Sequence, residues 1–364
     1  MKILLLGEYS NVHATLAKGL KALGHEVTVV SNGDFWKNYP RDINLVRSES
    51  KLGGIKYYAK LLSILPKLRG YDVVQLINPL FLELKAERIF PVYRYLRKHN
   101  KKVFMGAFGM DYYWVNTCIT SKPLRYSDFN IGDKIRHDLP AEREYKGWLG
   151  TEKERLNKFI AYDCDGIITG LYEYDVCYRP FFPDKTTYIP YPIECREQPD
   201  CSKHEGKIKF FIGISKTRSE YKGTDVMWRA LVRLQNKYPE RVEIIKAEGV
   251  PFEEYQKMVE RSDVLLDQLY SYTPAMNALL AMSLGKVIVG GGEEEHYDLL
   301  NESELRPIVN VLPDEKDVYN KMHHLVTHRD EIPKLKQQSV EYIARHHDYI
   351  KVAKKYVEVY KKRL

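Results

Sequence analysis

The chain of 364 residues exceeds what one hydrophobic core usually supports, so we expect two domains. Hydrophobic residues make up 44% of it and charged residues 29%, which excludes a disordered or fibrous protein. The net charge of +8 is spread along the sequence and favours an anionic ligand or an anionic membrane surface. Because the dense basic stripe of a nucleic-acid-binding protein is missing, we expect no nucleic-acid partner.

The cysteines and the N-terminus indicate the compartment. Five cysteines form no CxxC pair, which favours reduced thiols over a disulfide framework or a zinc site. The apolar run that follows Lys2 is too short for a signal peptide, and no stretch approaches the ~20 apolar residues of a membrane span. We therefore expect a cytoplasmic protein that visits the inner face of a membrane as a peripheral protein.

In the first half of the chain, short apolar runs alternate with helix-length amphipathic segments. The predicted strands are Lys2–Leu6, Glu26–Val30, Asp72–Ile77, Lys102–Gly106, Gly166–Thr169 and Thr187–Pro190. The predicted helices between them are Val12–Leu23, Ile55–Leu68 and Leu82–Lys98. Such alternation predicts a parallel sheet that is covered on both faces.

A polar, proline-containing stretch over residues 195–207 interrupts this alternation and marks the predicted linker. Further strands are then predicted at Ile208–Gly213, Val242–Lys246, Val264–Leu269, Val287–Gly290 and Pro307–Leu312, and further helices at Thr224–Lys237, Phe252–Arg261 and Ala275–Leu284. The sequence thus predicts an α/β protein with two Rossmann-like, doubly wound parallel-sheet domains that face a cleft. The domains are residues 1–194 and 208–345, followed by a basic C-terminal helix over residues 346–364. This helix carries lysines and tyrosines that could contact an anionic membrane, or it could cross back and pack its Tyr and Val side against the first domain.

Ligands of doubly wound sheets bind beyond the carboxyl ends of the strands, so the loops there hold the candidate site residues. The first strand ends in GEYSNVH, in which Gly7, Ser10, Asn11 and His13 precede or open a helix. No GxGxxG motif is present, which argues against a nicotinamide dehydrogenase. The loop suits a hydroxylated or anionic ligand at a helix N-terminus, although Ser10 or Asn11 could equally serve only as a helix cap.

A second candidate loop, GAFGMDYYW, follows the strand that ends at Gly106. Gly109 lets the backbone approach a ligand, and Asp111 with its aromatic neighbours resembles a sugar-binding wall. The alternative is that the aromatic residues only anchor a long irregular loop, which runs to about Pro140.

In the second half, Gly213 ends a strand and three cations follow it, Lys216, Arg218 and Lys222, before a helix opens at Gly223. Cations at a glycine-bordered helix start suit a diphosphate, although three cations within seven residues of a solvated loop are also common by chance. The acidic run that begins at Glu293 follows another strand and could hold sugar hydroxyls, or it could be a solvated surface run. The Asp163–Asp165 pair matches a metal-binding DxD motif but precedes its strand, so we expect no metal site there.

With these residues assembled, the chain resembles the GT-B glycosyltransferases, and within them family 4 of the retaining enzymes. GISKTRSEYKGTD is similar to the family's diphosphate loop, LLAMSLGKVIVGG to its donor-binding helix and strand, and CDGIITG to the strand that closes the first domain. The sequence departs from the family where Leu280 and Tyr272 replace two glutamates, one of which binds the ribose. Phe108 replaces a histidine of the first domain.

The resemblance implies a metal-independent, hexosyl-type transferase that moves a sugar from a nucleotide-diphosphate donor to a hydroxyl of a glycan or lipid-linked acceptor, without a cofactor. Arg218, Lys222 and Asp111 would serve catalysis. The donor would be bound by Gly213, Lys216, Glu248, Gly249, Val250, Tyr272, Asn277 and Glu293, and the acceptor by Gly7, Ser10, Asn11, His13, Phe108 and Gly109. The expected setting is polysaccharide or glycolipid synthesis. The alternatives are an inactive relative that binds sugar nucleotides or glycans, and a nucleotide-sugar epimerase.

Overall fold

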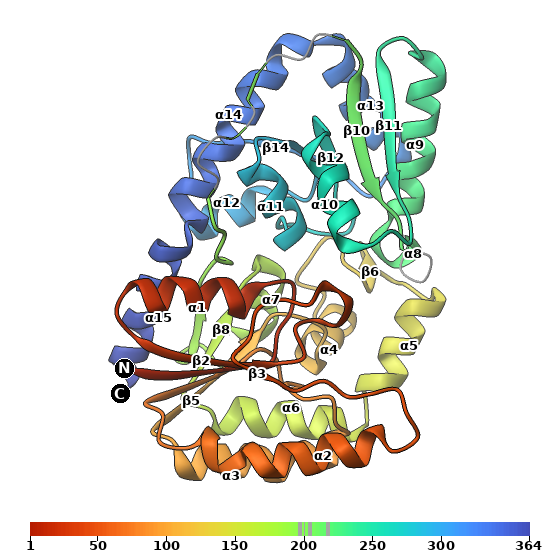
Figure 1. The fold of residues 1–364 in the computed structure, drawn as a ribbon. Helices are drawn as coiled ribbons and strands as arrows, with labels where there is room; N and C mark the ends of the chain where they lie inside the picture. Colours follow the sequence, from red (N-terminus) through yellow and green to blue (C-terminus); the bar gives the residue numbers. More distant parts are fainter. Residues whose placement is uncertain (196–198, 200, 203–205, 216–218) are drawn as a thin grey trace. The chain divides into compact units, whose positions relative to one another are not determined.

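The computed structural model describes residues 1–195, 199, 201–202, 206–215 and 219–364, which form two compact units (Figure 1). The first unit comprises Met1–Thr117, Glu144–Pro192 and Tyr349–Leu364, and the second comprises Cys118–Arg143 and Ile193–Asp348. This division differs from the predicted boundaries in one place, since segment 118–143, assigned by sequence to the first domain, belongs to the second unit. The C-terminal helix is grouped with the first unit.

The first unit is built on a seven-stranded parallel sheet with the strand order β3-β2-β1-β4-β5-β8-β9. Its central strands are buried on both faces, as the near-continuous apolar sequence of β1 requires. The order reverses between β1 and β4, which makes their carboxyl ends the switch point of this sheet. The strands are β1 (Lys2–Leu6), β2 (Glu26–Ser31), β3 (Ile43–Asn44), β4 (Val73–Leu76), β5 (Lys102–Ala107), β8 (Gly166–Thr169) and β9 (Thr186–Tyr188).

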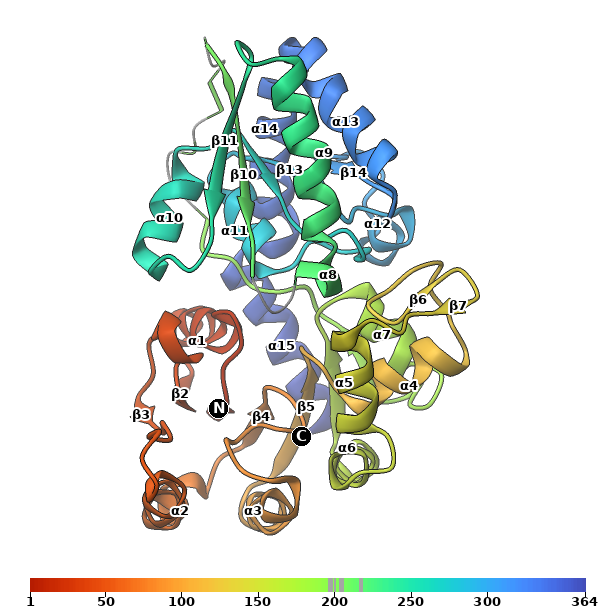
Figure 2. The ribbon, with the colours of Figure 1, turned by 90° about the vertical axis from the view of Figure 1, so that its right-hand side faces the viewer.

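Helices cover both faces of this sheet. In Figure 2, α1 and α15 lie on one face, and α2, α3 and α6 lie on the other. The helices and short helical turns are α1 (Val12–Ala22), η1 (Phe35–Lys37), α2 (Gly53–Ile64), η2 (Leu65–Leu68), α3 (Ala86–His99), α6 (Glu152–Asp163), α7 (Tyr172–Tyr178) and α15 (Tyr349–Arg363). The helices α4 (Tyr112–Thr120) and α5 (Leu139–Trp148) connect this unit to segment 118–143.

The second unit is built on a five-stranded parallel sheet with the order β11-β10-β12-β13-β14, whose switch point lies between β10 and β12. The strands are β10 (Ile208–Gly213), β11 (Val242–Ala247), β12 (Val264–Leu266), β13 (Val287–Gly290) and β14 (Ile308–Asn310). Segment 118–143 adds a two-stranded antiparallel hairpin of β6 (Asn130–Ile131) and β7 (Lys134–Ile135).

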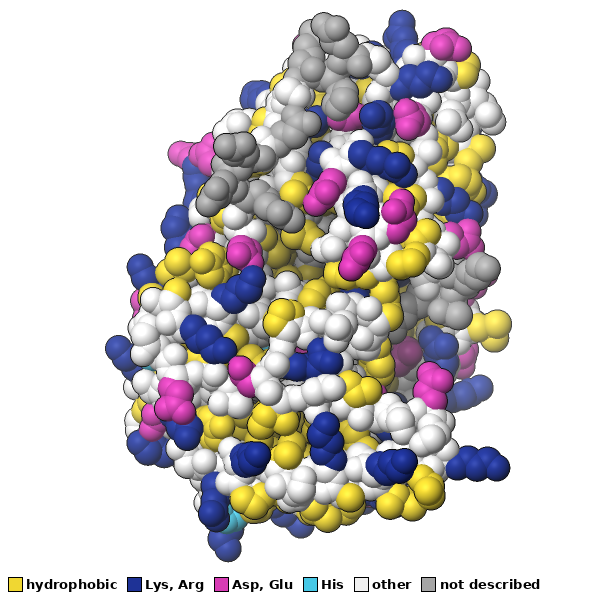
Figure 3. Space-filling model, viewed as in Figure 1, with side chains coloured by type: hydrophobic (Ala, Val, Ile, Leu, Met, Phe, Trp, Pro, Cys, Tyr) yellow, Lys and Arg dark blue, Asp and Glu magenta, His cyan; other side chains and the backbone are white. Residues whose placement is uncertain are grey.

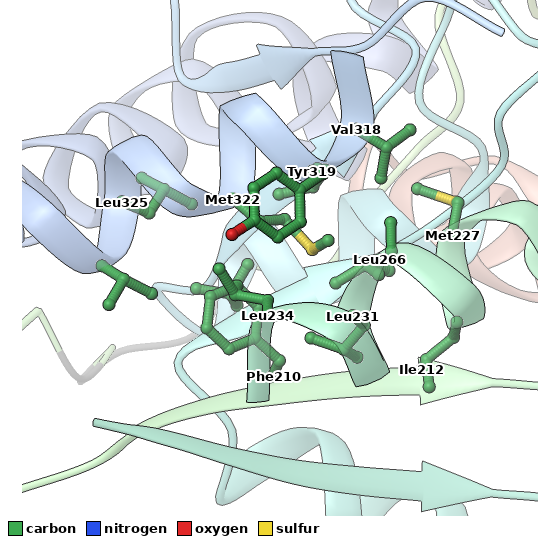
Figure 4. Close-up of a cluster of buried hydrophobic side chains, with 14 of the residues drawn as sticks. Phe210, Ile212, Met227, Leu231, Leu234, Leu266, Val318, Tyr319, Met322 and Leu325 are labelled. Atoms are coloured by element: carbon green, nitrogen blue, oxygen red, sulfur yellow. The ribbon is translucent and has the colours of Figure 1, made fainter. Parts of the chain in front are cut away.

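The helices of the second unit also cover both faces of its sheet, with α9 and α13 side by side on one of them (Figure 2). Apolar side chains of β10, β12, α9 and α13 interdigitate there to form the core of the unit (Figure 4). The helices are α8 (Ser219–Lys222), α9 (Thr224–Lys237), α10 (Phe252–Glu260), α11 (Met276–Ser283), α12 (Glu294–Leu300), α13 (Glu315–Thr327) and α14 (Ile332–Tyr342). The turns η3 (Arg329–Glu331) and η4 (Ile343–His347) flank α14.

Candidate functional site

The first unit places its predicted acceptor-binding residues at the carboxyl ends of β1 and β5, with β4 between them. After Gly7, Ser10 and Asn11 both adopt left-handed backbone conformations, with φ of 51° and 72°. The loop is held by Asp34, whose carboxylate accepts a hydrogen bond from the Ser10 amide at 2.8 Å and pairs with Lys37 at 2.6 Å. The Asn11 side chain forms no capping hydrogen bond to α1, so it does not serve as the helix cap that the sequence allowed.

His13 is fully buried, and its ring is neutral because burial lowers its pKa to about 3. The Nδ1 atom lies 2.8 Å from the Gly7 carbonyl oxygen, so Nδ1 carries the proton and donates it there. This leaves Nε2 as an acceptor that no described residue satisfies. The arrangement suits a ligand hydroxyl or a water molecule that donates to Nε2.

Glu8, which sequence reasoning passed over, holds the start of α1. Its buried carboxylate accepts hydrogen bonds from the amides of His13 at 3.2 Å and Ala14 at 2.8 Å. Burial raises the pKa of Glu8 to about 8 in spite of these donors. The two amides that α1 would otherwise offer to an anion are therefore already occupied, which favours a neutral, hydroxylated ligand at this loop.

The predicted residues after β5 are less accessible than expected. Phe108 packs edge-on against His13 with ring centroids 6.5 Å apart, and Gly109 lies against the Tyr9 ring. Asp111 is fully buried, and its carboxylate accepts hydrogen bonds from the Tyr178 hydroxyl at 2.7 Å and the Trp114 amide at 2.9 Å. In this conformation Asp111 stabilises the start of α4, and a direct contact with a sugar would require the loop to open.

In the second unit, Lys222 ends α8 beside the switch point of the sheet. Its carbonyl oxygen accepts a hydrogen bond from the Leu269 amide at 2.9 Å, which fixes the loop against the end of β12. Gly223 then turns into α9 with φ of 70°, and a Cβ atom there would lie 2.5 Å from Leu269 Cβ, so only glycine fits. Gly213 ends β10 as predicted, whereas Lys216 and Arg218 lie outside the described residues.

Asp267 is the clearest residue of this site that the sequence analysis missed. It follows β12 directly and is buried, with the amides of Gln268 and Ala275 donating to its carboxylate. No described residue forms a hydrogen bond with its Oδ2 atom. Burial raises the pKa of Asp267 to about 6, although the positive charge of Lys222 opposes the shift. A buried acceptor beside a cation at a switch point is suited to a ligand hydroxyl.

We expect Asp267→Asn to stabilise the free protein and to weaken its ligand binding. Because the folded-state pKa is above its ordinary value, the ionised carboxylate costs stability above about pH 6, and this cost disappears as the pH falls to about 4. The free energy of unfolding in urea should rise by about 1–2 kcal/mol at pH 7.5 and remain unchanged at pH 4. A gain that is equal at both pH values would show that ionisation of Asp267 is not its cause.

The remaining predicted donor-binding residues also lie at or near the carboxyl edge of this sheet. Glu248, Gly249 and Val250 follow β11, where the Glu248 carboxylate pairs with Lys246 at 2.6 Å. Asn277, in the first turn of α11, accepts a hydrogen bond from the Tyr255 hydroxyl at 3.0 Å. The structure thus gathers these side chains on neighbouring loops, and their role in binding stays a prediction.

Glu293 follows β13 and is held by the segment that the sequence analysis assigned to the other domain. Its carboxylate accepts hydrogen bonds from the Tyr126 hydroxyl and from Arg125, whose Nη2 atom is 2.7 Å away. The Arg125 amide also donates to the Tyr272 hydroxyl at 2.7 Å, and its guanidinium lies over the Tyr272 ring. Tyr272, at a position where the sequence resemblance would imply a glutamate, therefore anchors segment 118–143 on the second unit.

The aspartates of the DxD motif have structural partners. Asp163 accepts a hydrogen bond from the Tyr93 hydroxyl at 2.8 Å and pairs with Arg97. Asp165 pairs with Arg97 and Lys102 and accepts a hydrogen bond from the Val103 amide at 2.8 Å. Both lie at the amino end of β8, so these carboxylates tie α3 and β5 to that strand.

Comparison with solved structures identifies the fold. Sucrose-phosphate synthase from Thermosynechococcus elongatus superimposes with a TM-score of 0.62 at 12% identity, covering 100% of this chain and 99% of that one. The Anabaena protein HepE in complex with UDP-glucose gives 0.61 at 10% identity and full coverage of both chains. The catalytic domain of starch synthase IV from Arabidopsis thaliana, bound to ADP and acarbose, gives 0.60 at 10% identity, covering 100% and 99%.

The chain has the GT-B fold. The predicted fold class, an α/β protein with two Rossmann-like parallel sheets, is confirmed. No protein-family model matches the chain, and no curated protein matches its sequence. Among the described residues, no helix is both long enough and apolar enough to cross a membrane.

Proposed function

We propose that the protein is a glycosyltransferase that moves a sugar from a nucleotide-diphosphate donor to a hydroxyl of a glycan or lipid-linked acceptor. The observation that carries the proposal is the buried Asp267 carboxylate, whose Oδ2 atom no described residue satisfies and which lies within the electrostatic influence of Lys222 at the switch point of the second sheet, in a chain with the GT-B fold over its full length. HepE is described with UDP-glucose and starch synthase IV with ADP, so a nucleotide-linked hexose is the donor class that we propose here.

In this proposal the second unit binds the donor. The Lys222 ammonium contacts the diphosphate, and the Asp267 carboxylate accepts a hydrogen bond from a donor hydroxyl. Arg218, which lies outside the described residues, is proposed to share the phosphate contact. The first unit binds the acceptor through the loop of Ser10 and Asn11 and the free acceptor atom Nε2 of His13.

We further propose that the reaction needs no metal ion and retains the configuration of the sugar. As the bond between the anomeric carbon and the diphosphate oxygen breaks, the acceptor hydroxyl bonds to the same face of that carbon, and its proton passes to the departing phosphate. Negative charge grows on the diphosphate in this step, so a fixed cation such as Lys222 stabilises the transition state more than the ground state.

The test is a panel of nucleotide sugars, with nucleoside diphosphate release measured in the presence and absence of glycan and lipid-linked acceptors, and with a metal chelator throughout. A transferase releases nucleoside diphosphate mainly when an acceptor is present. Equal release without an acceptor would indicate an epimerase or a hydrolase. Donor binding by calorimetry without any release would indicate an inactive binding protein, and either result would contradict the proposal.

A further inference from the structure

The outer face of α2 combines exposed apolar and basic side chains in a regular pattern. Leu52, Ile55 and Leu62 are 56%, 68% and 49% exposed, although large aliphatic side chains of a soluble helix usually face the core. With Ala59 and Pro66 they recur at intervals of three and four residues, which places them in one stripe along the helix. The opposite stripe, Gly53, Tyr57, Leu61, Ile64 and Leu68, is buried against the first unit.

A basic stripe runs beside the apolar one. Lys56, Lys60 and Lys67 share a helical spacing of three and four residues with Ser63, and all four side chains are exposed. With Lys51 and Arg69, the segment contributes five positive charges, and the sequence from residue 50 to residue 71 contains no Asp or Glu. Figure 3 shows Lys and Arg side chains interspersed with hydrophobic ones at the lower edge of the view, in the region where α2 lies in Figure 1.

The neighbouring helix α3 extends the positive charge. Its Arg88 guanidinium lies over the Tyr58 ring of α2 at 5.7 Å, and the Tyr95 hydroxyl donates a hydrogen bond to the Leu65 carbonyl oxygen. The exposed side chains of α3 include Arg88, Arg94 and Lys98 but a single acidic residue, Glu87. An acidic protein surface would complement the positive charge of α2 and α3. It would not bury the apolar stripe, however, unless it also offered an apolar groove of matching shape.

We infer that α2 docks on an anionic lipid surface and lies in the plane of the interface. Apolar side chains that flank a basic stripe are the pattern of an interfacial helix, since the apolar stripe enters the acyl boundary while the lysines contact anionic headgroups. This assigns the membrane contact to α2 instead of the C-terminal helix. The exposed face of α15 carries Lys351, Lys354 and Lys355, but its tyrosines Tyr356 and Tyr360 are fully buried, so it offers charge without apolar area.

The test uses the full-length protein and flotation with vesicles of phosphatidylcholine alone or with 30% phosphatidylglycerol. Wild type should bind only the anionic vesicles, and binding should weaken between 0.05 M and 0.3 M salt. The variant Lys56→Gln/Lys60→Gln should lower the partition coefficient by about 30-fold, because each lysine near the surface contributes about fivefold. Ile55→Ser/Leu62→Ser should lower it by about 10-fold or more, with the melting temperature unchanged because these side chains are exposed.

The matched control is Lys351→Gln/Lys354→Gln, which removes two exposed lysines from α15. It should change the partition coefficient by less than threefold. Three results would each overturn the inference: an equal loss in the control, binding that the α2 variants leave unchanged, or no binding to any vesicle, which would leave a protein as the occupant of this face. The readout is partitioning, so a failure of transferase activity would not be confused with a failure of docking.

Discussion

Replacing Lys222 by alanine is expected to weaken nucleoside diphosphate binding by about 10–100-fold. Charge-assisted hydrogen bonds to a phosphate contribute roughly 1.5–3 kcal/mol each, and Lys222 ends α8 at a turn that the Leu269 hydrogen bond and Gly223 hold in place. The turnover rate should fall further than binding, since charge grows on the leaving diphosphate in the transition state. Calorimetry with UDP and ADP measures the first effect without knowledge of the sugar.

Two variants sharpen this prediction. Lys222→Arg keeps the charge but replaces a compact ammonium by a planar fork, so it should recover part of the affinity and less of the rate. Lys321→Ala removes an exposed lysine from α13 of the same unit and should leave both quantities unchanged. If Lys222→Ala binds nucleoside diphosphates as wild type does, the donor site has been assigned to the wrong loop.

The largest loss of stability is expected from Lys336→Met. The Lys336 ammonium is fully buried and pairs with the Asp263 carboxylate at 2.9 Å, which joins α14 to the residue before β12. Removing the cation leaves a buried carboxylate without its counter-charge, which costs about 3–5 kcal/mol in other proteins. We expect the free energy of unfolding in urea to fall by about that amount.

Its control is Lys334→Met, which changes an exposed lysine on the same helix and should alter stability by less than about 0.5 kcal/mol. The double variant Lys336→Met/Asp263→Asn should recover much of the loss. The Asn side chain removes the stranded charge, and its carbonyl oxygen still accepts the hydrogen bond that Lys209 N donates to Asp263 at 3.0 Å. A double variant as unstable as Lys336→Met alone would mean that packing, and not charge, accounts for the effect.

Local patterns were sufficient to predict the elements that position the site. The strands β8, β10 and β13 and the helix α9 have the bounds that their sequences predict, because buried parallel strands are apolar runs closed by glycine, polar or charged residues. The same pattern-based prediction missed Asp267 as a site residue. The apolar run Val264–Leu269 suggested one strand, whereas β12 ends at Leu266 and Asp267 turns into the site. The poor fit of Asp to a strand interior was the available signal.

Partners far apart in the sequence could not be predicted. Arg125 and Tyr126 form hydrogen bonds with Glu293, which is more than a hundred and sixty residues away in the sequence. No hydrophobic periodicity within segment 118–143 could predict that contact. Both α2 and α15 combine lysines with large apolar or aromatic side chains. The single sequence does not show that the tyrosines of α15 are buried whereas the leucine and isoleucine side chains of α2 are exposed. Which stripe of each helix faces the sheet depends on the neighbouring elements as well as on spacing.

The packing of α15 on α1 has a consequence for biosynthesis. A Cβ atom at Gly19 would lie 2.4 Å from the Tyr349 carbonyl oxygen, and the Tyr360 hydroxyl donates a hydrogen bond to Gln75 on β4 at 3.1 Å. Because α15 is synthesised long after α1, α1 waits for this contact, and at ordinary rates of translation the delay is on the order of 20–60 s. Throughout it, the face of the first sheet that Tyr360 later covers remains open to chaperones.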